Sequence, residues 1–260
     1  MTVQHRPGFA RALRESHRIL IGTWVKIPSL ETVEILAIAG FDFVVIDMEH
    51  APLDLQSAYA ATVVAQGAGM HVLVRVPDRS GSHIQRMLDS GVDGILVPRV
   101  ETPAAAAAAA RAMTFSPSGD RGNGSTSRAG GWGSVELEAY LRSGDALLRA
   151  VQVEHLDGLA LAHEILDVPG LNGVFLGMGD LQLSSGLRSD DTIIDSAVDH
   201  LLDHALERGI PVGTAVQTPE QVEAASDRGF AFVMASNDTG ILRSGATSLV
   251  SDIHRRLRSL

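Results

Sequence analysis

Strand-like and helix-like segments alternate eight times along this chain, and this alternation is the strongest constraint on its fold. The strand-like segments are short runs rich in Val, Ile and Leu, at residues 19–26, 41–47, 71–76, 94–98, 147–153, 173–176, 210–215 and 230–235. The helical segments that follow them are 30–39, 53–67, 82–90, 103–113, 157–166, 191–208, 219–228 and 242–260. Eight β/α units predict an α/β fold of the (β/α)8 barrel type.

Glycines mark the ends of several helical segments in this repeat. Gly40, Gly91, Gly209 and Gly229 each follow a helical segment directly, where a left-handed C-cap residue is expected. The alternative fold is an open doubly wound sheet, but its G-x-G-x-x-G signature after the first strand is absent. We therefore expect residues 1–260 to form one barrel domain.

Composition narrows the function classes. The chain has 260 residues and is 45% hydrophobic, which is enough for a packed core, and its 4% of aromatic residues leaves aliphatic side chains and alanine to fill that core. A net charge of −10 argues against a nucleic-acid or anionic-membrane surface. The absence of cysteine excludes disulfides, thiolate metal sites and thiol nucleophiles. With no signal-peptide core at the start and no apolar run of about 18 residues, a cytoplasmic protein is expected.

Four polar side chains each come at or just after the end of a predicted strand: His50, Arg75, Glu154 and Asp180. In a parallel barrel these positions share the face that carries the active site. Glu154 and Asp180 follow adjacent strands, whose ends lie roughly 5 Å apart, so both carboxylates can reach one cation. Two carboxylates with open positions suit Mg²⁺ or Mn²⁺. The alternative is an ion pair or, for Asp180 in GMGDLQ, a helix N-cap.

The other two groups suit proton transfer and anion binding. An imidazole titrates near neutral pH, so His50 is a candidate general base. The guanidinium of Arg75 can bind a carboxylate and stabilise an enolate, or pair with Asp47 or Glu49, and the two roles can coexist.

The glycine- and serine-rich segment 116–133 interrupts the repeat between units four and five. A connection of this length is usually functional or disordered. We expect it at the active-site face as a loop or partial lid, with Arg121 and Arg128 as candidate anion ligands, or else as a surface insertion.

Taken together, these segments resemble the HpcH/HpaI aldolases, the metal-dependent class II pyruvate aldolases. The resemblance runs from about residue 22 to 235 and is carried in order by GTWVKIPS, FDFVVIDMEHAP, VRVP, MLDSGVDGILVPRVET, GDRGNGS, VQVE and LNGVFLGMGDL. It implies reversible cleavage of 4-hydroxy-2-oxo acids into pyruvate and an aldehyde, with Mg²⁺, Mn²⁺ or Co²⁺ as cofactor. It also implies a cytoplasmic homohexamer, in which the C-terminal helix at about 242–260 is a candidate for subunit contacts.

The resemblance assigns a role to each residue. Glu154 and Asp180 would bind the metal, and Arg75 would hold the pyruvyl oxygen. His50 would be the acid/base, oriented by Asp89. Gln152 would lie beside the metal, and the backbone amides of Gly177, Met178 and Gly179 would receive the pyruvate carboxylate.

The chain departs from the family where GMGDLQ replaces a G-P-x-D-L-S type of sequence. The exchange of proline for Met178 is expected to loosen this loop and add bulk near the carboxylate pocket. Three alternatives stay open. They are an acyl-CoA lyase of the malyl or citryl type, a catalytically silent barrel that serves as a binding module, and a Schiff-base aldolase that uses Lys26, the chain's one lysine.

Overall fold

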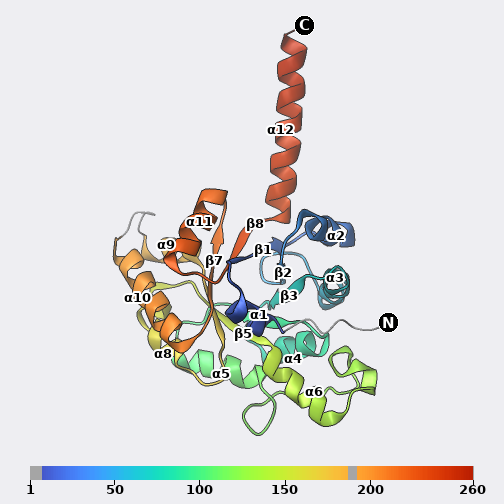
Figure 1. The fold of residues 1–260 in the computed structure, drawn as a ribbon, viewed down its shortest axis with the longest axis vertical. Helices are drawn as coiled ribbons and strands as arrows, with labels where there is room; N and C mark the ends of the chain where they lie inside the picture. Colours follow the sequence, from blue (N-terminus) through green and yellow to red (C-terminus); the bar gives the residue numbers. More distant parts are fainter. Residues whose placement is uncertain (1–7, 187–191, 260) are drawn as a thin grey trace.

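The computed structural model describes residues 8–186 and 192–259, in which parallel strands close into a barrel in the order β1 to β8 (Figure 1). The barrel closes because β1 pairs with both β2 and β8. The strands are β1 (Leu20–Val25), β2 (Phe43–Asp47), β3 (His71–Arg75), β4 (Gly94–Val97), β5 (Leu148–Val153), β6 (Gly173–Leu176), β7 (Val212–Val216) and β8 (Phe232–Asn237). The predicted (β/α)8 fold is confirmed.

Helices surround the strands. The α-helices are α1 (Phe9–Glu15), α2 (Leu30–Ala39), α3 (Leu55–Gly67), α4 (Gly81–Asp89), α5 (Pro103–Met113), α6 (Leu137–Ser143), α7 (Leu156–Ala160), α8 (Ala162–Leu166), α9 (Met178–Ser185), α10 (Thr192–Arg208), α11 (Pro219–Arg228) and α12 (Asp238–Arg258). Two short 3₁₀ helices, η1 (Arg128–Gly133) and η2 (Gly144–Ala146), flank α6. The helix predicted at 157–166 is divided into α7 and α8. The helix start considered in GMGDLQ is α9, and α1 and α6 were not predicted. The predicted helix start at 191 and end at 260 lie outside the described residues.

The glycine caps agree with their predicted roles. Gly40, Gly91, Gly209 and Gly229 all have positive φ, between 63° and 101°. This left-handed conformation ends the preceding helix and turns the chain toward the next strand without a Cβ clash.

Side-chain alternation along each strand divides the core into two layers. On β2, Phe43 and Val45 point into the barrel, while Val44 and Ile46 pack outward against the helices. Five of the chain's eleven aromatic residues lie in the barrel interior, which was expected to be filled by aliphatic side chains and alanine: Phe9, Trp24, Phe43, Phe175 and Phe232. Gly22 makes room for one of them, because a Cβ there would lie 2.3 Å from the ring of Phe43.

Helix α1 closes the end of the barrel at which the strands begin. The ring of Phe9 lies 5.0 Å from that of Phe43 and stacks on His71 at 4.8 Å. His71 opens β3, so this apolar plug leaves only the opposite end, where the strands finish, available for a polar site.

Segment 116–133 does not lie at that polar end, which corrects the expectation of an active-site loop. It follows α5 and leads to α6, so it belongs to a helix-to-strand connection, and these connections lie where the strands begin. Arg128 donates to the carbonyl oxygens of Ser90 and Gly91, at the turn that leads into β4. Figure 1 accordingly shows α6 at the end of the molecule far from α12.

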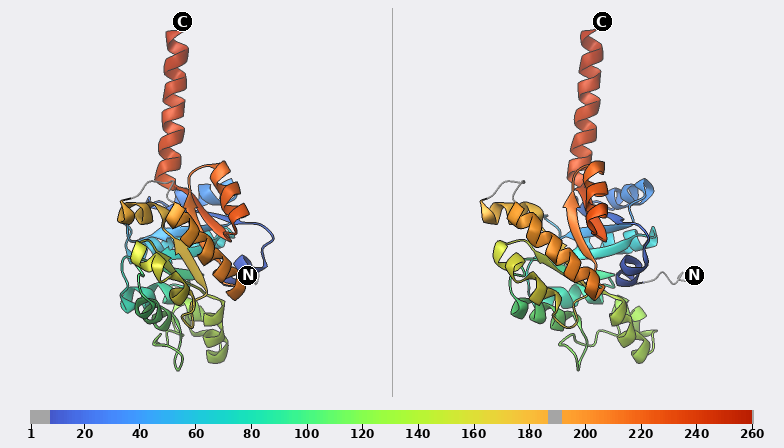
Figure 2. Two further views of the ribbon diagram at one scale, coloured as in Figure 1. Left: turned by 90° about the vertical axis from the view of Figure 1, so that its left-hand side faces the viewer. Right: turned by 60° about the vertical axis from the view of Figure 1, so that its left-hand side comes forward.

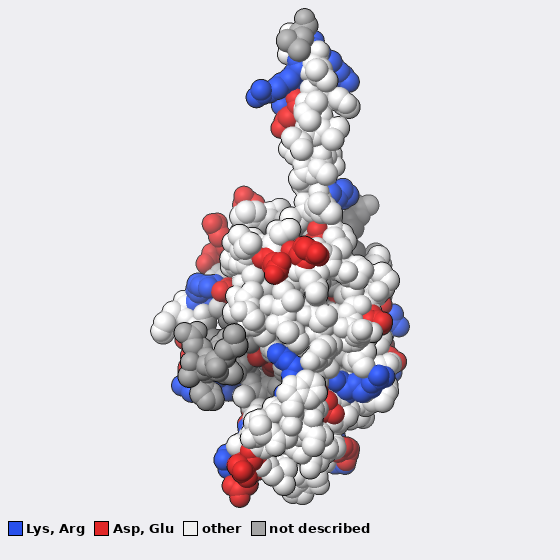
Figure 3. All heavy atoms as spheres, turned by 90° about the vertical axis from the view of Figure 1, so that its right-hand side faces the viewer, with Lys and Arg blue, Asp and Glu red and all other residues white. Residues whose placement is uncertain are grey.

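Helix α12 extends away from the barrel as a straight column (Figures 1 and 2). Exposed apolar side chains run along it: Ile241, Leu242, Leu249, Val250, Ile253 and Leu257. Figure 3 shows this column as mostly uncharged below a basic tip, where Arg255, Arg256 and Arg258 fall in the last turn. Among the residues described, no helix has the length and apolar character required to cross a bilayer.

Candidate active site

The charged side chains of the site come from the C-terminal ends of neighbouring strands. Lys26 follows β1, Asp47 ends β2, Arg75 ends β3 and Glu154 directly follows β5. The register pairs Asp47 with Arg75 across β2 and β3, so the fold itself brings these two residues side by side.

A buried ion pair forms the centre of this group. Arg75 donates from Nε to Asp47 Oδ1 at 2.9 Å and from Nη2 to Asp47 Oδ2 at 2.8 Å. This bidentate contact, together with the Trp24 ring 4.3 Å from the guanidinium carbon, fixes the plane of the guanidinium. The remaining Nη1 faces Glu49 Oε2 at 3.2 Å and Gln152 Oε1 at 3.5 Å. Arg75 therefore pairs with Asp47 through Nε and Nη2, while its Nη1 edge faces away from that pair. The two roles considered from the sequence, an ion pair and an anion ligand, can thus coexist.

Asp47 also shapes the turn that carries His50. Its Oδ1 accepts the backbone N–H groups of Glu49 and His50, each at 3.2 Å. Arg75 and Lys26 lower the pKa of Asp47 to about 2 against the opposing effect of burial. The His50 ring is half exposed, with Nε2 at 3.7 Å from Glu49 Oε2. The imidazole is thus available to a bound molecule while its backbone is held in place.

A cavity of about 320 Å³ opens at this end of the barrel. Acidic and basic groups line it: Glu49, His50, Arg99, Glu101, Glu154, His155 and Asp180, with Ser184. Asp180 lies within the first turn of α9 rather than at its N-cap, which is Gly177, so the capping role considered for Asp180 is not the one it has. Glu154 and Asp180 therefore line the same cavity.

Glu154 accepts hydrogen bonds from two neighbouring residues, and its negative charge is disfavoured by its surroundings. Its Oε1 accepts the backbone N–H of Arg99 at 2.9 Å, and its Oε2 accepts a short hydrogen bond from Gln152. Arg99 has a φ of 55°, a left-handed conformation that is uncommon outside glycine. Burial, with the nearby charges of Glu49 and Asp180, raises the pKa of Glu154. The excess of negative charge at Glu154 is what a divalent cation would relieve.

The donor set is compatible with such a cation. Buried Glu49 Oε2 accepts no hydrogen bond from any residue described, although it faces Arg75. Across residues 8–186 and 192–259, no group of three or more His, Asp or Glu side chains is placed so that it could hold a metal ion. Two carboxylates without a third protein ligand fit Mg²⁺ or Mn²⁺, which retain waters and substrate oxygens.

The loop after β6 is compact at Gly177. A Cβ there would lie 2.8 Å from Glu154 Cβ and 3.1 Å from Gln152 Nε2. The Gly177 N–H donates to Val153 O. Met178 and Gly179 are the first residues of α9, so their N–H groups have no acceptor within the helix itself.

Met178 differs from expectation. It occupies the first position of α9, and its partly buried side chain packs against the core outside the barrel rather than lining the cavity. Proline is favoured at that helical position, which explains why the family's residue fits there, but methionine is tolerated too. Helix α9 begins directly at Met178, so the chain still forms a helix start where the family sequence has proline.

Asp89 lies elsewhere. It ends α4, accepts a hydrogen bond from Gln85 at 2.7 Å and lies 3.8 Å from Arg121, near the end of the barrel where β4 begins. No contact between Asp89 and His50 occurs within the described part of the chain. Arg121 itself is buried over the Phe115 ring at 4.1 Å, so it is not the exposed anion ligand that the sequence suggested.

Sequence reasoning missed Arg99 and Glu101, which follow β4 in VPRVE and line the cavity. The strand-end rule, that polar residues at or just after the end of a barrel strand lie at the active-site face, applies to them equally. From the sequence, Asp47 and Glu49 were considered only as ion-pair partners of Arg75. The hydrogen bonds of Asp47 to the His50 turn depend on local backbone geometry that no sequence pattern encodes.

Comparison with known proteins agrees with this geometry. The family model described as HpcH/HpaI aldolase/citrate lyase matches residues 20–244. A hydroxypyruvate/pyruvate aldolase of Roseobacter denitrificans is 33% identical over 94% of this chain and 95% of its own length. A 5-keto-4-deoxy-D-glucarate aldolase of Klebsiella pneumoniae is 30% identical over 96% and 98%, respectively.

Solved structures point to the same group. The crystal structure of an HpcH/HpaI aldolase/citrate lyase family protein from Burkholderia cenocepacia has a TM-score of 0.88 and 28% identity, and covers 96% of this chain and all (100%) of its own. The chain therefore belongs to the HpcH/HpaI aldolase/citrate lyase family, which confirms both the family and the enzyme class, an aldolase-type lyase, predicted from its sequence.

Proposed function

We propose that this protein is a divalent-metal-dependent aldolase that reversibly cleaves 4-hydroxy-2-oxo acids into pyruvate and an aldehyde. One observation carries the proposal. The outward edge of Arg75, the carboxylates of Glu154 and Asp180, and the imidazole of His50 meet at one end of the barrel. Relatives named as hydroxypyruvate/pyruvate and 5-keto-4-deoxy-D-glucarate aldolases support the same reaction class.

Glu154 and Asp180 would hold Mg²⁺, Mn²⁺ or Co²⁺. Once bound, the cation supplies Lewis-acid polarisation of the 2-oxo group. The first amides of α9, at Met178 and Gly179, would receive the substrate carboxylate, since a helix N-terminus favours an anion.

The protein's own groups account for the remaining chemistry. His50 takes the proton of the 4-hydroxyl group while the C3–C4 bond breaks, which releases the aldehyde and leaves a pyruvate enolate. Arg75 directs Nη1 toward the developing enolate oxygen, and Gln152 lies between Arg75 and Glu154 to orient both. Protonation at C3 then gives pyruvate, and the reverse sequence forms the carbon–carbon bond.

The proposed protein assembly is a homohexamer in which α12 packs on a second copy of the chain. Its exposed apolar side chains support this, because a stripe of that kind on a helix standing clear of its own barrel is stabilised by burial (Figure 2). In such an assembly Asp89 can orient only the His50 of a neighbouring copy, since the two residues lie toward opposite ends of one barrel.

Measuring pyruvate release from a panel of 4-hydroxy-2-oxo acids tests the proposal. The protein is stripped with EDTA and then supplied with Mg²⁺, Mn²⁺ or Co²⁺. We expect turnover only with added metal. Turnover that survives stringent metal removal and disappears in a Lys26→Ala variant would support the Schiff-base alternative. Turnover restricted to malyl- or citryl-CoA would support the acyl-CoA lyase, and no turnover at all the silent barrel.

The ion pair of Lys26 argues against the Schiff-base route. Its Nζ lies 2.9 Å from Asp47 Oδ2, and this carboxylate has no exposed surface. A protonated amine held by a buried carboxylate is not a nucleophile.

A further inference from the structure

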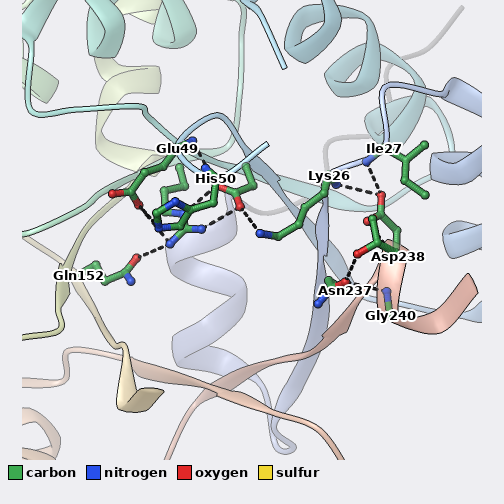
Figure 4. A network of polar contacts seen from close by, with 11 residues as sticks. Lys26, Ile27, Glu49, His50, Gln152, Asn237, Asp238 and Gly240 are labelled. Carbon is green, nitrogen blue, oxygen red and sulfur yellow. Dashed lines mark hydrogen bonds and ion pairs between the residues drawn. The ribbon is translucent and has the colours of Figure 1, made fainter. Parts of the chain in front are cut away.

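We propose that Lys26 is a positioning residue of the active site and that Asp238, the first residue of α12, fixes the turn that carries it. The inference rests on the proposed function, because it explains how Arg75 is kept ready for an enolate. Figure 4 shows Lys26 between Asp238 on one side and the group that contains Glu49 and His50 on the other.

The first step concerns how many groups depend on Asp47. Its Oδ1 accepts Arg75 Nε and the backbone N–H groups of Glu49 and His50. Its Oδ2 accepts Arg75 Nη2 at 2.8 Å and pairs with Lys26 Nζ at 2.9 Å. A single fully buried carboxylate thus orients both Arg75 and the turn that carries His50. Lys26 is a further partner of this carboxylate and is part of neither group.

The second step concerns charge. Asp47 and Glu49 are both buried acids in contact with Arg75, which lies 3.2 Å from Glu49 through Nη1. Glu49 has a second cation in Arg99, whose Nε lies 3.4 Å from Glu49 Oε1. Among the described residues, Asp47 would be left with Arg75 alone if Lys26 were absent. Lys26 supplies the second cation at Asp47. Arg75 Nη1 lies 3.2 Å from Glu49 Oε2 without forming a hydrogen bond to it, so this edge of the guanidinium stays available to the substrate.

The third step concerns what holds Lys26. Asp238 is 3% exposed, and its Oδ2 accepts the backbone N–H groups of Lys26 at 2.9 Å and Ile27 at 2.8 Å. Its Oδ1 accepts Thr239 N–H at 2.7 Å, within the first turn of α12. The carboxylate therefore joins the base of α12 to the turn after β1. Its neighbour Asn237 caps α12 separately, by accepting Gly240 N–H at 2.7 Å.

Kinetics of two Lys26 variants test the positioning role. Lys26→Met keeps the length and removes the charge, whereas Lys26→Arg keeps the charge. Because Arg75 acts mainly on the enolate, we expect Lys26→Met to lower kcat by about tenfold or more with KM changed by less than about threefold. Lys26→Arg should recover most of the loss. A Lys26→Met enzyme within about twofold of wild-type kcat, or an equal loss in both variants, would overturn the role.

A second measurement does not depend on the folding of a Lys26 variant, and its main readout, an NMR resonance, does not depend on turnover. Lys26 is the only lysine, so protein labelled with ¹⁵N at the lysine Nζ gives one side-chain ammonium resonance. We expect Asp238→Ala to shift or broaden this resonance and to lower kcat. Asn237→Ala removes the α12 cap and the hydrogen bond from the Thr239 hydroxyl but no contact with Lys26, so it should leave both near their wild-type values.

The two variants must differ for the inference to stand. Equal effects of Asp238→Ala and Asn237→Ala on the Lys26 resonance would refute the link through Asp238. If no 4-hydroxy-2-oxo acid is cleaved by the wild-type protein, the proposed function fails. The resonance then still decides whether Asp238 holds Lys26.

Discussion

Replacing Asp47 by Asn is expected to weaken the fold in a way that depends on pH. Asp47 is fully buried and paired with both Arg75 and Lys26, which lower its pKa from 3.8 to about 2. That difference corresponds to about 2.5 kcal/mol of stability at neutral pH. The variant also leaves two cations facing a neutral amide, and breaking a buried ion pair typically costs about 3–5 kcal/mol. We therefore expect a loss of about 2.5 kcal/mol or more at pH 7.

The sign of the pH dependence follows from the lowered pKa. A carboxyl whose pKa is lower in the folded protein stabilises it above the unfolded pKa, and this contribution disappears as the pH falls toward the folded value. For Asp47 the window lies between pH 3.8 and about 2. The stabilisation should fall to about half at pH 3.

Urea unfolding followed by circular dichroism at fixed protein concentration measures this difference at pH 7, 4 and 3. Asp120→Asn is a matched control. It breaks the Arg111–Asp120 pair, whose side chains are 57% and 60% exposed, and should change stability by less than about 1 kcal/mol. An Asp47→Asn protein within about 0.5 kcal/mol of wild type at pH 7, or a difference unchanged at pH 3, would refute the reasoning about this buried pair.

Four further predictions concern the site. His50→Gln should lower kcat by about 10²–10⁴-fold with an unchanged circular dichroism spectrum, measured by pyruvate release, and a smaller change would remove His50 from the proton transfer. Glu154→Gln should abolish Mn²⁺ binding, measured by calorimetry. It should leave the metal-free protein at least as stable as wild type at pH 7, because burial raises the pKa of Glu154 and so disfavours its charged form in the fold. For the same reason wild-type metal affinity should start to decline, on acidification, at a pH above the ordinary glutamate value of 4.5. Gly177→Ala should lower kcat/KM by about tenfold or more, because a Cβ 2.8 Å from Glu154 Cβ displaces that ligand, and unaltered kinetics would show that the loop can yield.

The strand-end rule accounts for what the sequence could predict of the site. His50, Arg75, Glu154 and Asp180 each follow an apolar strand, and parallel strands bring such positions to one face. The rule does not reach Asp89, because a helix that precedes a strand ends at the other face. It also misplaced segment 116–133, since counting β/α units does not say whether an insertion comes before or after the helix.

The network around Asp47 was not predictable from residue types. Its hydrogen bonds to the Glu49–His50 turn arise from backbone geometry, and its contact with Lys26 depends on the register that brings β1 beside β2. The direction of α12 was equally hidden. Periodicity reports an apolar face on a helix but not whether that face covers its own barrel or another chain.

Deuterium exchange at the methyl group of pyruvate tests the central claim most directly. Forming a pyruvate enolate in D₂O and reprotonating it replaces methyl hydrogen by deuterium, whatever the natural aldehyde is. Proton NMR should show the methyl signal of pyruvate declining when the protein is supplied with Mg²⁺ or Mn²⁺, and persisting after EDTA treatment or in Arg75→Ala. Exchange that continues without metal, or none in the metal-supplied wild-type protein, would contradict the account.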